Sequence, residues 1–383
     1  MRKFLVLLIM VSMLILPFTS FAQPAEEIGI TVNSKSAILI DSESKRVMFE
    51  KDADKKLPIA SVTKVMTLLL TFETIDSGNL TMDEKITATE TAASMGGSQV
   101  FIDAGYDYTV ENLIKSVIIA SGNDAAVLLA EKISGSEDAF VVKMNKRAQE
   151  LGMNNTTFKN CTGLPENDHL STARDVAIMS SELLKHEEYF KWGTIWMDEL
   201  HHDKDGRKTE LVNTNKLIRS LNGCDGLKTG YTSEAGFCVS TTAKRGDMRL
   251  ISVILGGSTS KDRFKESAEL INYGFANYQN NSVVKTGEIM GTVSIKGAVE
   301  KNANAIALTD FKLCVKNDGS DKIETRVELL NDITAPVKQG QEIGKVIVSI
   351  NGKEIGTVTL VSQNEHKRAG FIDRLKGIIS NWR

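Results

Sequence analysis

The fold of this chain is decided by the stretch PIASVTK at residues 58–64, which continues as VMTLLLTF at residues 65–72. Apolar residues occupy nearly every position after Lys64, and a helix that is apolar on all sides is buried inside a domain rather than lying on its surface. The pattern therefore predicts a central, buried helix that carries Ser61 and Lys64 at its opening turn. The domain around it must be large enough to cover that helix.

A serine and a lysine three positions apart lie on the same face of a helix, so the amine can reach the hydroxyl. A serine hydroxyl is a poor nucleophile until a neighbour accepts its proton, and a lysine does this only when its pKa is depressed. Burial at a helix start, close to a second cation, lowers the pKa of an amine. We therefore predict that Ser61 is an acylated nucleophile and that Lys64 is its base.

The Ser-x-x-Lys spacing by itself is weak evidence. It also occurs at Ser42–Lys45, Ser258–Lys261 and Ser282–Lys285. The first of these falls in a predicted hairpin turn, where nothing would remove the lysine from water. The function therefore depends on which other residues accompany Ser61 and Lys64.

The remainder of the first 278 residues predicts an α+β domain. Periodicity and turn signals give strands of one antiparallel sheet and helices that cover it. The predicted strands are 36–40, 46–50, 225–232, 237–244 and 249–255, with shorter β-like pieces near Ile86 and at 100–102. The predicted helices, besides the one after Ser61, begin at Thr109 and after a cap at Asp124, and then span 139–151, 172–184 and 262–278.

The composition changes near Asn280, where short alternating runs are separated by Gly, Asn and Asp, as is typical of a small all-β domain. At the end of the chain, residues 371–382 place apolar side chains on one helical face, and residues 367–383 carry five basic residues against Asp373 alone. A basic amphipathic helix of this kind is expected to lie at a membrane surface with anionic lipids. The alternative is a helix docked on the β domain.

The N-terminus predicts export. Arg2 and Lys3 precede an apolar run from Phe4 to Leu16 and small residues up to Ala22, which is typical of a secretory signal cleaved after Ala22. A retained membrane anchor is the less favoured alternative, because the run is shorter than the roughly 20 residues that a span needs. Loss of residues 1–22 removes two of 46 basic and none of 49 acidic residues, which leaves a net charge of −5. That charge argues against a nucleic-acid partner.

The cysteines and histidines predict no metal site. Cys161, Cys224, Cys238 and Cys314 have no Cys-x-x-Cys spacing, and His201 and His202 are adjacent rather than one helical turn apart. A bridge between Cys224 and Cys238 is conceivable in an exported protein, but free thiols are the favoured reading.

Three motifs follow each other along the chain: Ser61-x-x-Lys64, Ser121-Gly122-Asn123 and Lys228-Thr229-Gly230. One is predicted at the start of a buried helix, one in a turn between helices and one on a strand. Acyl transfer to and from a peptide needs a nucleophile, a base and a surface for the substrate, and three such positions supply them. A glycine at position 230 is expected to leave the strand surface open, so that a peptide can lie alongside as an added strand.

With these motifs, the sequence resembles the penicillin-recognising serine enzymes, and most closely the low-molecular-mass penicillin-binding proteins that act as D-alanyl-D-alanine carboxypeptidases. The resemblance extends from about Ile28 to Trp382, and the signal, trailing β domain and tail fit that family's layout. The stretches that carry it are 58–64, 95–98, 120–126, 162–164 and 225–232.

The resemblance implies a role for each matched residue. Ser61 is the acylated nucleophile, Lys64 the proton acceptor and Ser121 a proton relay to the leaving amine. Asn123 binds a substrate backbone amide, Lys228 supplies positive charge, which would also keep Lys64 neutral, and Thr229 meets the terminal carboxylate. The backbone N–H groups of Ser61 and Tyr231 form the oxyanion hole, where one donor is worth about 3–4 kcal/mol. No metal or organic cofactor is implied.

Two positions depart from the family pattern. Some relatives carry an arginine in the segment that matches 212–217 and use it to hold the substrate carboxylate, whereas this chain has Thr214. Tyr231 stands where some members have histidine, but a backbone donor does not depend on its side chain.

The resemblance leaves three rivals to the carboxypeptidase. A β-lactamase of the most similar class needs a Glu-x-x-Leu-Asn segment, and the segment 164–170 holds Glu166 without that continuation. A D,D-endopeptidase that cuts D-alanine cross-links would differ from a carboxypeptidase only in how much space its site leaves for substrate beyond the scissile bond. A non-catalytic penicillin-binding sensor would carry a broken motif set.

The expected layout is a signal peptide at 1–22, a catalytic domain at 28–278, a β-rich domain at 280–363 and a membrane-associating helix at 366–383. The expected partners are peptidoglycan stem peptides, β-lactam antibiotics as covalent inhibitors, and the outer face of the cytoplasmic membrane. We expect the enzyme to remove one D-alanine from stem pentapeptides and thereby to control cross-linking.

Overall fold

A five-stranded antiparallel sheet forms the centre of the first part of the chain in this computed structural model, which describes residues 29–373. The strand order is β2-β1-β9-β8-β7, so that β7 lies at one edge. The five strands are β1 Ser36–Asp41, β2 Val47–Lys51, β7 Cys224–Thr232, β8 Gly236–Arg245 and β9 Met248–Gly257. The predicted sheet is confirmed, although its strands come from the two ends of a 220-residue stretch of sequence.

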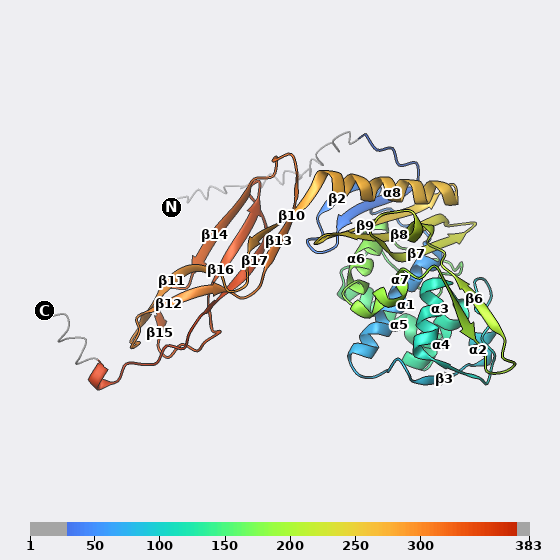
Figure 1. The fold of residues 1–383 in the computed structure, drawn as a ribbon, viewed down its shortest axis with the longest axis horizontal. Coiled ribbons are helices and arrows are strands. Elements are labelled where there is room, and N and C mark those ends of the chain that lie inside the picture. The colour runs from blue at the N-terminus through green and yellow to red at the C-terminus, as the bar shows by residue number, and fades with distance from the viewer. Residues whose placement is uncertain (1–28, 374–383) are drawn as a thin grey trace, which may run out of the picture. The chain divides into compact units, whose positions relative to one another are not determined.

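Helices cover the sheet, as Figure 1 shows for the long helix α8 that lies along β8 and β9. Helix α6 packs against β9 and β1 and also contacts α1, which is buried along most of its length. Eight α-helices are described: α1 Lys64–Asp76, α2 Glu90–Ala93, α3 Val110–Ile119, α4 Asn123–Ser134, α5 Glu137–Glu150, α6 Ala173–Leu183, α7 Phe190–Gly193 and α8 Ser260–Asn277. Three 3₁₀ turns accompany them, at Ala60–Thr63, Glu187–Tyr189 and Lys216–Arg219.

The β-like piece predicted at 100–102 is not a strand. The backbone N–H groups of Val100 and Ile102 donate to the carboxylate of Asp124, at 3.0 and 3.3 Å, and therefore need no strand partner. The same contact explains why Asp124 does not cap α4 as predicted: the helix already begins at Asn123, and Asp124 lies in its first turn. An apolar run can satisfy its amides with one buried carboxylate, which periodicity does not reveal.

Two short antiparallel strand pairs accompany the helices, and the second was not predicted. Strand β3 at Lys85–Thr87 pairs with β4 at Asp107–Thr109, so that the predicted β character near Ile86 is found, while Thr109 caps α3. Strand β5 at Met197–His201 pairs with β6 at Lys208–Val212. These two strands are mostly polar and half-exposed, and they carry little of the apolar alternation that predicts a strand.

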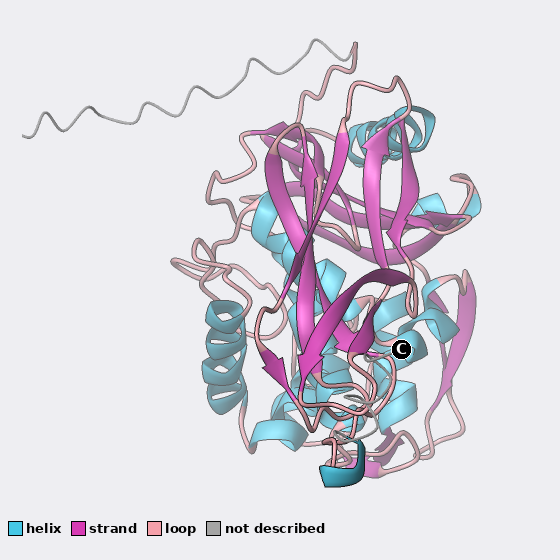
Figure 2. Cartoon of the chain, turned by 90° about the vertical axis from the view of Figure 1, so that its left-hand side faces the viewer, coloured by secondary structure: helices cyan, strands magenta, loops and turns pink. Residues whose placement is uncertain are grey.

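The C-terminal part is all-β, as predicted, and has an apolar core of its own. Figure 2 shows its long twisted strands. A six-stranded sheet has the order β14-β16-β17-β12-β11-β15, and β10 pairs separately with β13. The strands are β10 Tyr278–Val284, β11 Ile289–Lys296, β12 Asn302–Ala307, β13 Phe311–Lys316, β14 Ile323–Leu329, β15 Ile333–Thr334, β16 Glu342–Ile350 and β17 Lys353–Ser362.

The ends of the predicted layout lie partly outside the described residues. The predicted signal peptide at 1–22 and most of the predicted tail helix fall there. At the start of that predicted helix, His366 and Arg368 instead form β-bridges with Val337 and Ala298, so helix begins no earlier than Phe371. Within residues 29–373, no helix has the length and apolarity to cross a membrane.

Candidate active site

Ser61 and Lys64 meet where a 3₁₀ turn runs into the central helix. Ser61 lies in the turn Ala60–Thr63, and Lys64 is the first residue of α1. The Nζ atom of Lys64 lies 3.0 Å from Oγ of Ser61. The Lys64 side chain is fully buried, whereas Ser61 is half-buried and open to a substrate. The structure thus brings together the pair that the sequence predicted.

The other contacts of Lys64 determine where its lone pair can point. Besides Ser61, the amine contacts Oδ1 of Asn123 at 2.5 Å and the carbonyl oxygen of Thr162 at 2.8 Å. An amide oxygen and a carbonyl oxygen can only accept, and a neutral amine has two N–H groups and one lone pair. When Lys64 is neutral, these two acceptors take both N–H groups, so the lone pair faces the hydroxyl of Ser61. This is the orientation of a general base.

Burial lowers the pKa of the Lys64 amine to about 7. The amine lies under the central sheet, away from water, and the charged form loses its solvation there. The sequence prediction gave Lys228 as the second cation that keeps Lys64 neutral, but burial is the principal cause. Burial, followed by the positive charges of Lys64 and Arg263, holds the pKa of Lys228 well below its usual range.

The pH dependence of acylation follows from this pKa. Because the neutral amine is the base, we expect the rate of acylation by a penicillin to rise about tenfold per pH unit below pH 7 and to level off above it. The deprotonated fraction of Lys64 increases as the pH passes upward through about 7, which sets the sign. Stopped-flow measurement of acylation between pH 5 and 9 checks this expectation. A rate that is flat across pH 7, or that falls with rising pH, contradicts it.

Asn123 and Ser121 enter the site from the start of α4 and the turn before it. The Asn123 amide is held at both ends, because its Nδ2 donates to the Gly96 carbonyl at 2.6 Å while its Oδ1 accepts from Lys64. Ser121 has a left-handed backbone, with φ at 64°, a conformation that is uncommon outside glycine and concentrated at functional sites. Its buried Oγ finds no hydrogen-bond partner among the described residues. Ser121 is thus poised to bind an atom that the protein does not supply.

Strand β7 brings Lys228, Thr229, Gly230 and Tyr231 against the Ser61 turn. A Cβ atom at Gly230 would lie 2.7 Å from the Ile59 carbonyl oxygen and 2.9 Å from the Ser61 nitrogen, both closer than real Cβ contacts. This glycine therefore lets β7 pack on the turn that holds the nucleophile, and its expected role in leaving the strand surface open to a peptide stays a prediction. A peptide still has the free edge of β7 to lie along.

Thr229 lies beside the position that departs from the family pattern. Its hydroxyl donates to the hydroxyl of Thr214 at 2.8 Å. The backbone N–H of Thr214 donates to the Ile119 carbonyl at 3.2 Å, at the end of α3, and this fixes its place. Two neutral hydroxyls thus stand together where some relatives are expected to have a hydroxyl and a guanidinium.

The loop at 160–164 holds one of the acceptors for Lys64, and its role was not predicted from sequence. The Asn160 side chain ties this loop together: its Oδ1 accepts from the Gly163 N–H at 2.7 Å, and its Nδ2 donates to the Leu164 carbonyl. Gly163 has φ at +81°, and a Cβ there would lie 1.9 Å from the Ala60 carbonyl oxygen. The Thr-Gly-Leu match at 162–164 was the only sequence signal for this contact.

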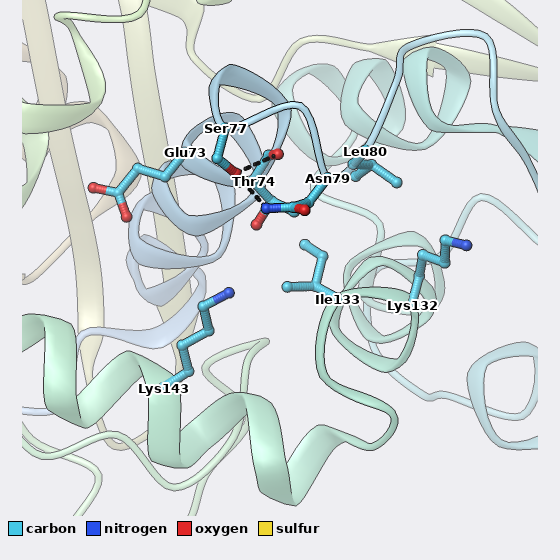
Figure 3. A pocket seen from close by; sticks show the side chains of 8 residues that line it. All are labelled: Glu73, Thr74, Ser77, Asn79, Leu80, Lys132, Ile133 and Lys143. Atoms are coloured by element: carbon cyan, nitrogen blue, oxygen red, sulfur yellow. Dashed lines mark hydrogen bonds between the residues drawn. The ribbon is translucent and has the colours of Figure 1, made fainter.

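Two hollows in the described structure lie outside the contacts of Ser61 and Lys64. A cavity of about 390 Å³ lies at the far end of α1, lined by Glu73, Thr74, Ser77, Asn79, Leu80, Lys132, Ile133 and Lys143 (Figure 3). A small hollow of about 10 Å³ lies beside the Ser61 turn and is lined in part by the exposed Glu166, which makes no hydrogen bond to Ser61 or Lys64 within residues 29–373. Within residues 29–373, no group of three or more His, Cys, Asp or Glu side chains could hold a metal ion. All four cysteines are free thiols.

Two family profiles match this chain in succession. Residues 20–259 match the D-alanyl-D-alanine carboxypeptidase family known as peptidase S11, and residues 278–368 match the C-terminal domain of penicillin-binding protein 5. The D-alanyl-D-alanine carboxypeptidase DacF of Bacillus subtilis is 40% identical over 353 residues, which cover 91% of this chain and 90% of that protein.

Solved structures agree with the sequence matches. Penicillin-binding protein 5 of Haemophilus influenzae superimposes with a TM-score of 0.76 at 30% identity, covering 88% of this chain and 98% of that structure. Penicillin-binding protein D2 of Listeria monocytogenes, solved in a cefotaxime-bound form, is 35% identical over 64% of this chain and 98% of its own, with a TM-score of 0.58. The chain therefore belongs to the peptidase S11 family of D-alanyl-D-alanine carboxypeptidases.

Proposed function

We propose that this protein removes the terminal D-alanine from peptidoglycan stem pentapeptides through an acyl-enzyme on Ser61. The observation that carries this proposal is the setting of the Lys64 amine, which is buried, has both N–H groups engaged and directs its lone pair at a half-exposed serine hydroxyl. That arrangement activates a serine without a histidine. Family membership indicates the substrate class.

Acylation begins when Oγ of Ser61 attacks the carbonyl carbon between the two terminal D-alanines and its proton passes to Lys64. The negative charge that develops on the carbonyl oxygen is held by the backbone N–H groups of Ser61 and Tyr231. The C–N bond then breaks, and the departing amine takes a proton that Ser121 relays from Lys64. The unpartnered hydroxyl of Ser121 supports this role. Free D-alanine leaves, and the remaining peptide is held as an ester.

Deacylation repeats these steps with water as the nucleophile. Lys64 takes a proton from the water as its oxygen attacks the ester carbonyl, and the C–O bond to Ser61 breaks. The Ser61 oxygen then recovers a proton from Lys64. The products are a tetrapeptide with a free carboxylate and the original enzyme, so that atoms and protons balance without a cofactor.

The substrate is placed along the free edge of β7, where backbone groups pair with an added strand. Its terminal carboxylate lies at the paired hydroxyls of Thr229 and Thr214. Gly230 keeps β7 against the Ser61 turn, and Lys228 lines the interior beneath the strand. In the free enzyme, Nδ2 of Asn123 donates to the Gly96 carbonyl. To bind a substrate carbonyl, this Nδ2 must donate to both carbonyls or replace the Gly96 carbonyl with that of the substrate.

A β-lactam antibiotic acylates the same serine, since it presents a strained amide to the same nucleophile. The Listeria relative solved with cefotaxime supports this assignment. The carboxylate of Glu166 is exposed and makes no hydrogen bond to Ser61 or Lys64 within residues 29–373, so it does not take the place of the water-activating glutamate of a β-lactamase. A long-lived penicilloyl enzyme is expected, and rapid nitrocefin turnover would favour the β-lactamase alternative.

The protein is placed outside the cytoplasmic membrane. The signal-like segment at 1–22 supports export, and the basic amphipathic segment within 366–383 supports attachment to the membrane surface. Between the signal-like segment and the amphipathic segment, we propose a catalytic domain at 28–278 and a β domain at 280–363. The separate apolar cores of these two parts support that division.

The test of this proposal is to incubate purified protein with a stem pentapeptide and to measure released D-alanine. We expect release from the pentapeptide but not from the tetrapeptide, and a benzylpenicillin adduct of one equivalent that peptide mapping places on Ser61. A cross-linked dimer offered in parallel tests the endopeptidase alternative. Absence of release combined with an adduct on Ser61 would indicate a sensor, and an adduct on another residue would remove Ser61 from the mechanism.

A further inference from the structure

Arg263 is a buried guanidinium that no carboxylate accompanies. It lies in the first turn of α8, its residue is 8% exposed, and none of the ion pairs found within residues 29–373 includes it. Burial of an unpaired charge is costly, and a cation at a helix N-terminus opposes the helix dipole. Neither the packing of the core nor the stability of α8 accounts for the choice of arginine here.

The short hydrogen bonds of Arg263 go to two backbone carbonyls of the central sheet, and its Nη2 also donates to the Ser260 hydroxyl at 3.4 Å. Its Nη1 donates to the Gly230 carbonyl at 2.8 Å and to the Cys238 carbonyl at 3.0 Å. These two residues are cross-strand partners on β7 and β8. The guanidinium also lies against the rings of Phe264 and Phe237, at 4.7 and 5.4 Å from their centroids. Arg263 is therefore held firmly beneath the edge strand.

The Gly230 carbonyl belongs to the same peptide group as the N–H of Tyr231. In a trans peptide the C=O and N–H bonds point in opposite directions. The Gly230 carbonyl faces Arg263 and the side of β8, so the Tyr231 N–H faces away from them, toward the free edge of β7. The Ser61 nitrogen lies close to Gly230 on this strand, within 2.9 Å of where its Cβ would be.

We infer that Arg263 is a positioning residue for the oxyanion hole: its charged hydrogen bond to the Gly230 carbonyl orients the 230–231 peptide and strengthens the Tyr231 N–H as a donor. This inference rests on the proposed function. Hydrogen bonds to a charged donor are stronger than neutral ones, and linked hydrogen bonds polarise each other. A negative charge that develops on the substrate oxygen is thus coupled through one peptide group to a cation behind the strand.

Arg263 also supplies a permanent positive charge close to the site, besides the charge that the sequence analysis expects from Lys228. Burial lowers the pKa of Arg263 only to about 10, so its guanidinium stays charged at neutral pH. A fixed positive charge thus lies behind β7, next to the Gly230 carbonyl.

Three substitutions separate the charge of Arg263 from its hydrogen bonds. Arg263→Lys keeps a charged hydrogen-bond donor and Arg263→Gln keeps a neutral one. Arg263→Met removes both the charge and the donor and keeps a long side chain that fills part of the same space. We expect the acylation rate constant with a fluorescent penicillin to fall about a hundredfold in Arg263→Met, at the lower end of the range seen on loss of an oxyanion donor, and about tenfold in Arg263→Gln, which retains a neutral donor. Arg263→Lys is expected to recover a large part of the rate. The dissociation constant of the non-covalent complex should be unchanged.

A boronic acid that mimics the terminal D-alanine provides a second readout, because its adduct with a serine is tetrahedral and carries the negative oxygen. Its affinity should fall with the acylation rate constant across the three variants. The matched control is Arg249→Met, which removes a guanidinium of the same sheet that pairs with Asp225 at 2.8 Å. That variant should lose thermal stability without losing acylation rate at a temperature where it is folded.

The outcomes distinguish this inference from the proposed function. The inference is wrong if Arg263→Met lowers the melting temperature but acylates at the wild-type rate when folded. It is also wrong if Arg263→Gln and Arg263→Lys are equally impaired in acylation. Arg263 would then contribute to stability alone. In either case the wild-type protein still releases D-alanine. If the wild-type protein releases none and forms no adduct on Ser61, the proposed function itself fails.

Discussion

Ser61→Ala is expected to abolish release of D-alanine and covalent labelling by penicillin, with a loss of at least about 10⁴-fold in rate. Labelling should disappear altogether, since no covalent bond can form without the hydroxyl oxygen. The half-exposed Ser61 contributes little to packing, so the melting temperature should stay close to that of the wild type. Fluorescent penicillin labelling on a denaturing gel and a D-alanine assay measure the two effects.

The chain offers its own control for this experiment. Ser42 has a lysine at the same spacing, but it lies in the turn between β1 and β2, where the Lys45 amine donates to the Ser42 carbonyl oxygen at 2.7 Å and, within residues 29–373, not to the Ser42 hydroxyl. Ser42→Ala should therefore label and release D-alanine as the wild type does. Labelling that survives in Ser61→Ala, or that is lost in Ser42→Ala, would show that the wrong serine has been identified.

Lys64→Met and Lys64→Arg are each expected to lower the acylation rate by about 10³-fold or more, because neither side chain can take the Ser61 proton. The second variant is the more informative, since it retains a positive charge in the site. A guanidinium keeps its proton at neutral pH, so Lys64→Arg would stay active if the site required only a positive charge at this position. Single-turnover acylation, followed by stopped flow, gives the rate constants.

Stability needs separate attention in the Lys64 variants. Methionine leaves the Asn123 and Thr162 oxygens without their donor, and each buried acceptor left unpaired costs about 1–3 kcal/mol. Rates are therefore compared at a temperature where circular dichroism shows each variant folded. Lys45→Met serves as the control on an exposed turn. A folded Lys64→Arg variant with wild-type acylation would contradict the assignment of Lys64 as the base.

Local sequence patterns predicted most of the elements and the three motifs. The helix after Ser61, the five strands of the sheet and the all-β C-terminal part follow from apolar periodicity and turn residues, which are properties of neighbouring positions. Ser61 and Lys64 were also predictable as a pair, because three residues of helix fix their separation. The patterns failed at 100–102, where the Asp124 carboxylate satisfies the backbone, and at the mostly polar hairpin β5–β6.

The tertiary structure alone decided which groups complete the site. The Thr162 carbonyl, 98 residues from Lys64, and the Arg263 guanidinium, 33 residues from Gly230, act through backbone atoms that every residue type possesses. No side-chain pattern reports a backbone carbonyl. The close packing of Gly230 on the Ser61 turn and the place of Arg263 behind β7 likewise became clear only with the tertiary structure. The sequence by itself thus determined the nucleophile, its base and the elements that carry them, whereas long-range packing decided what orients the base and what lies behind the oxyanion hole, because burial and backbone direction are properties of the folded chain.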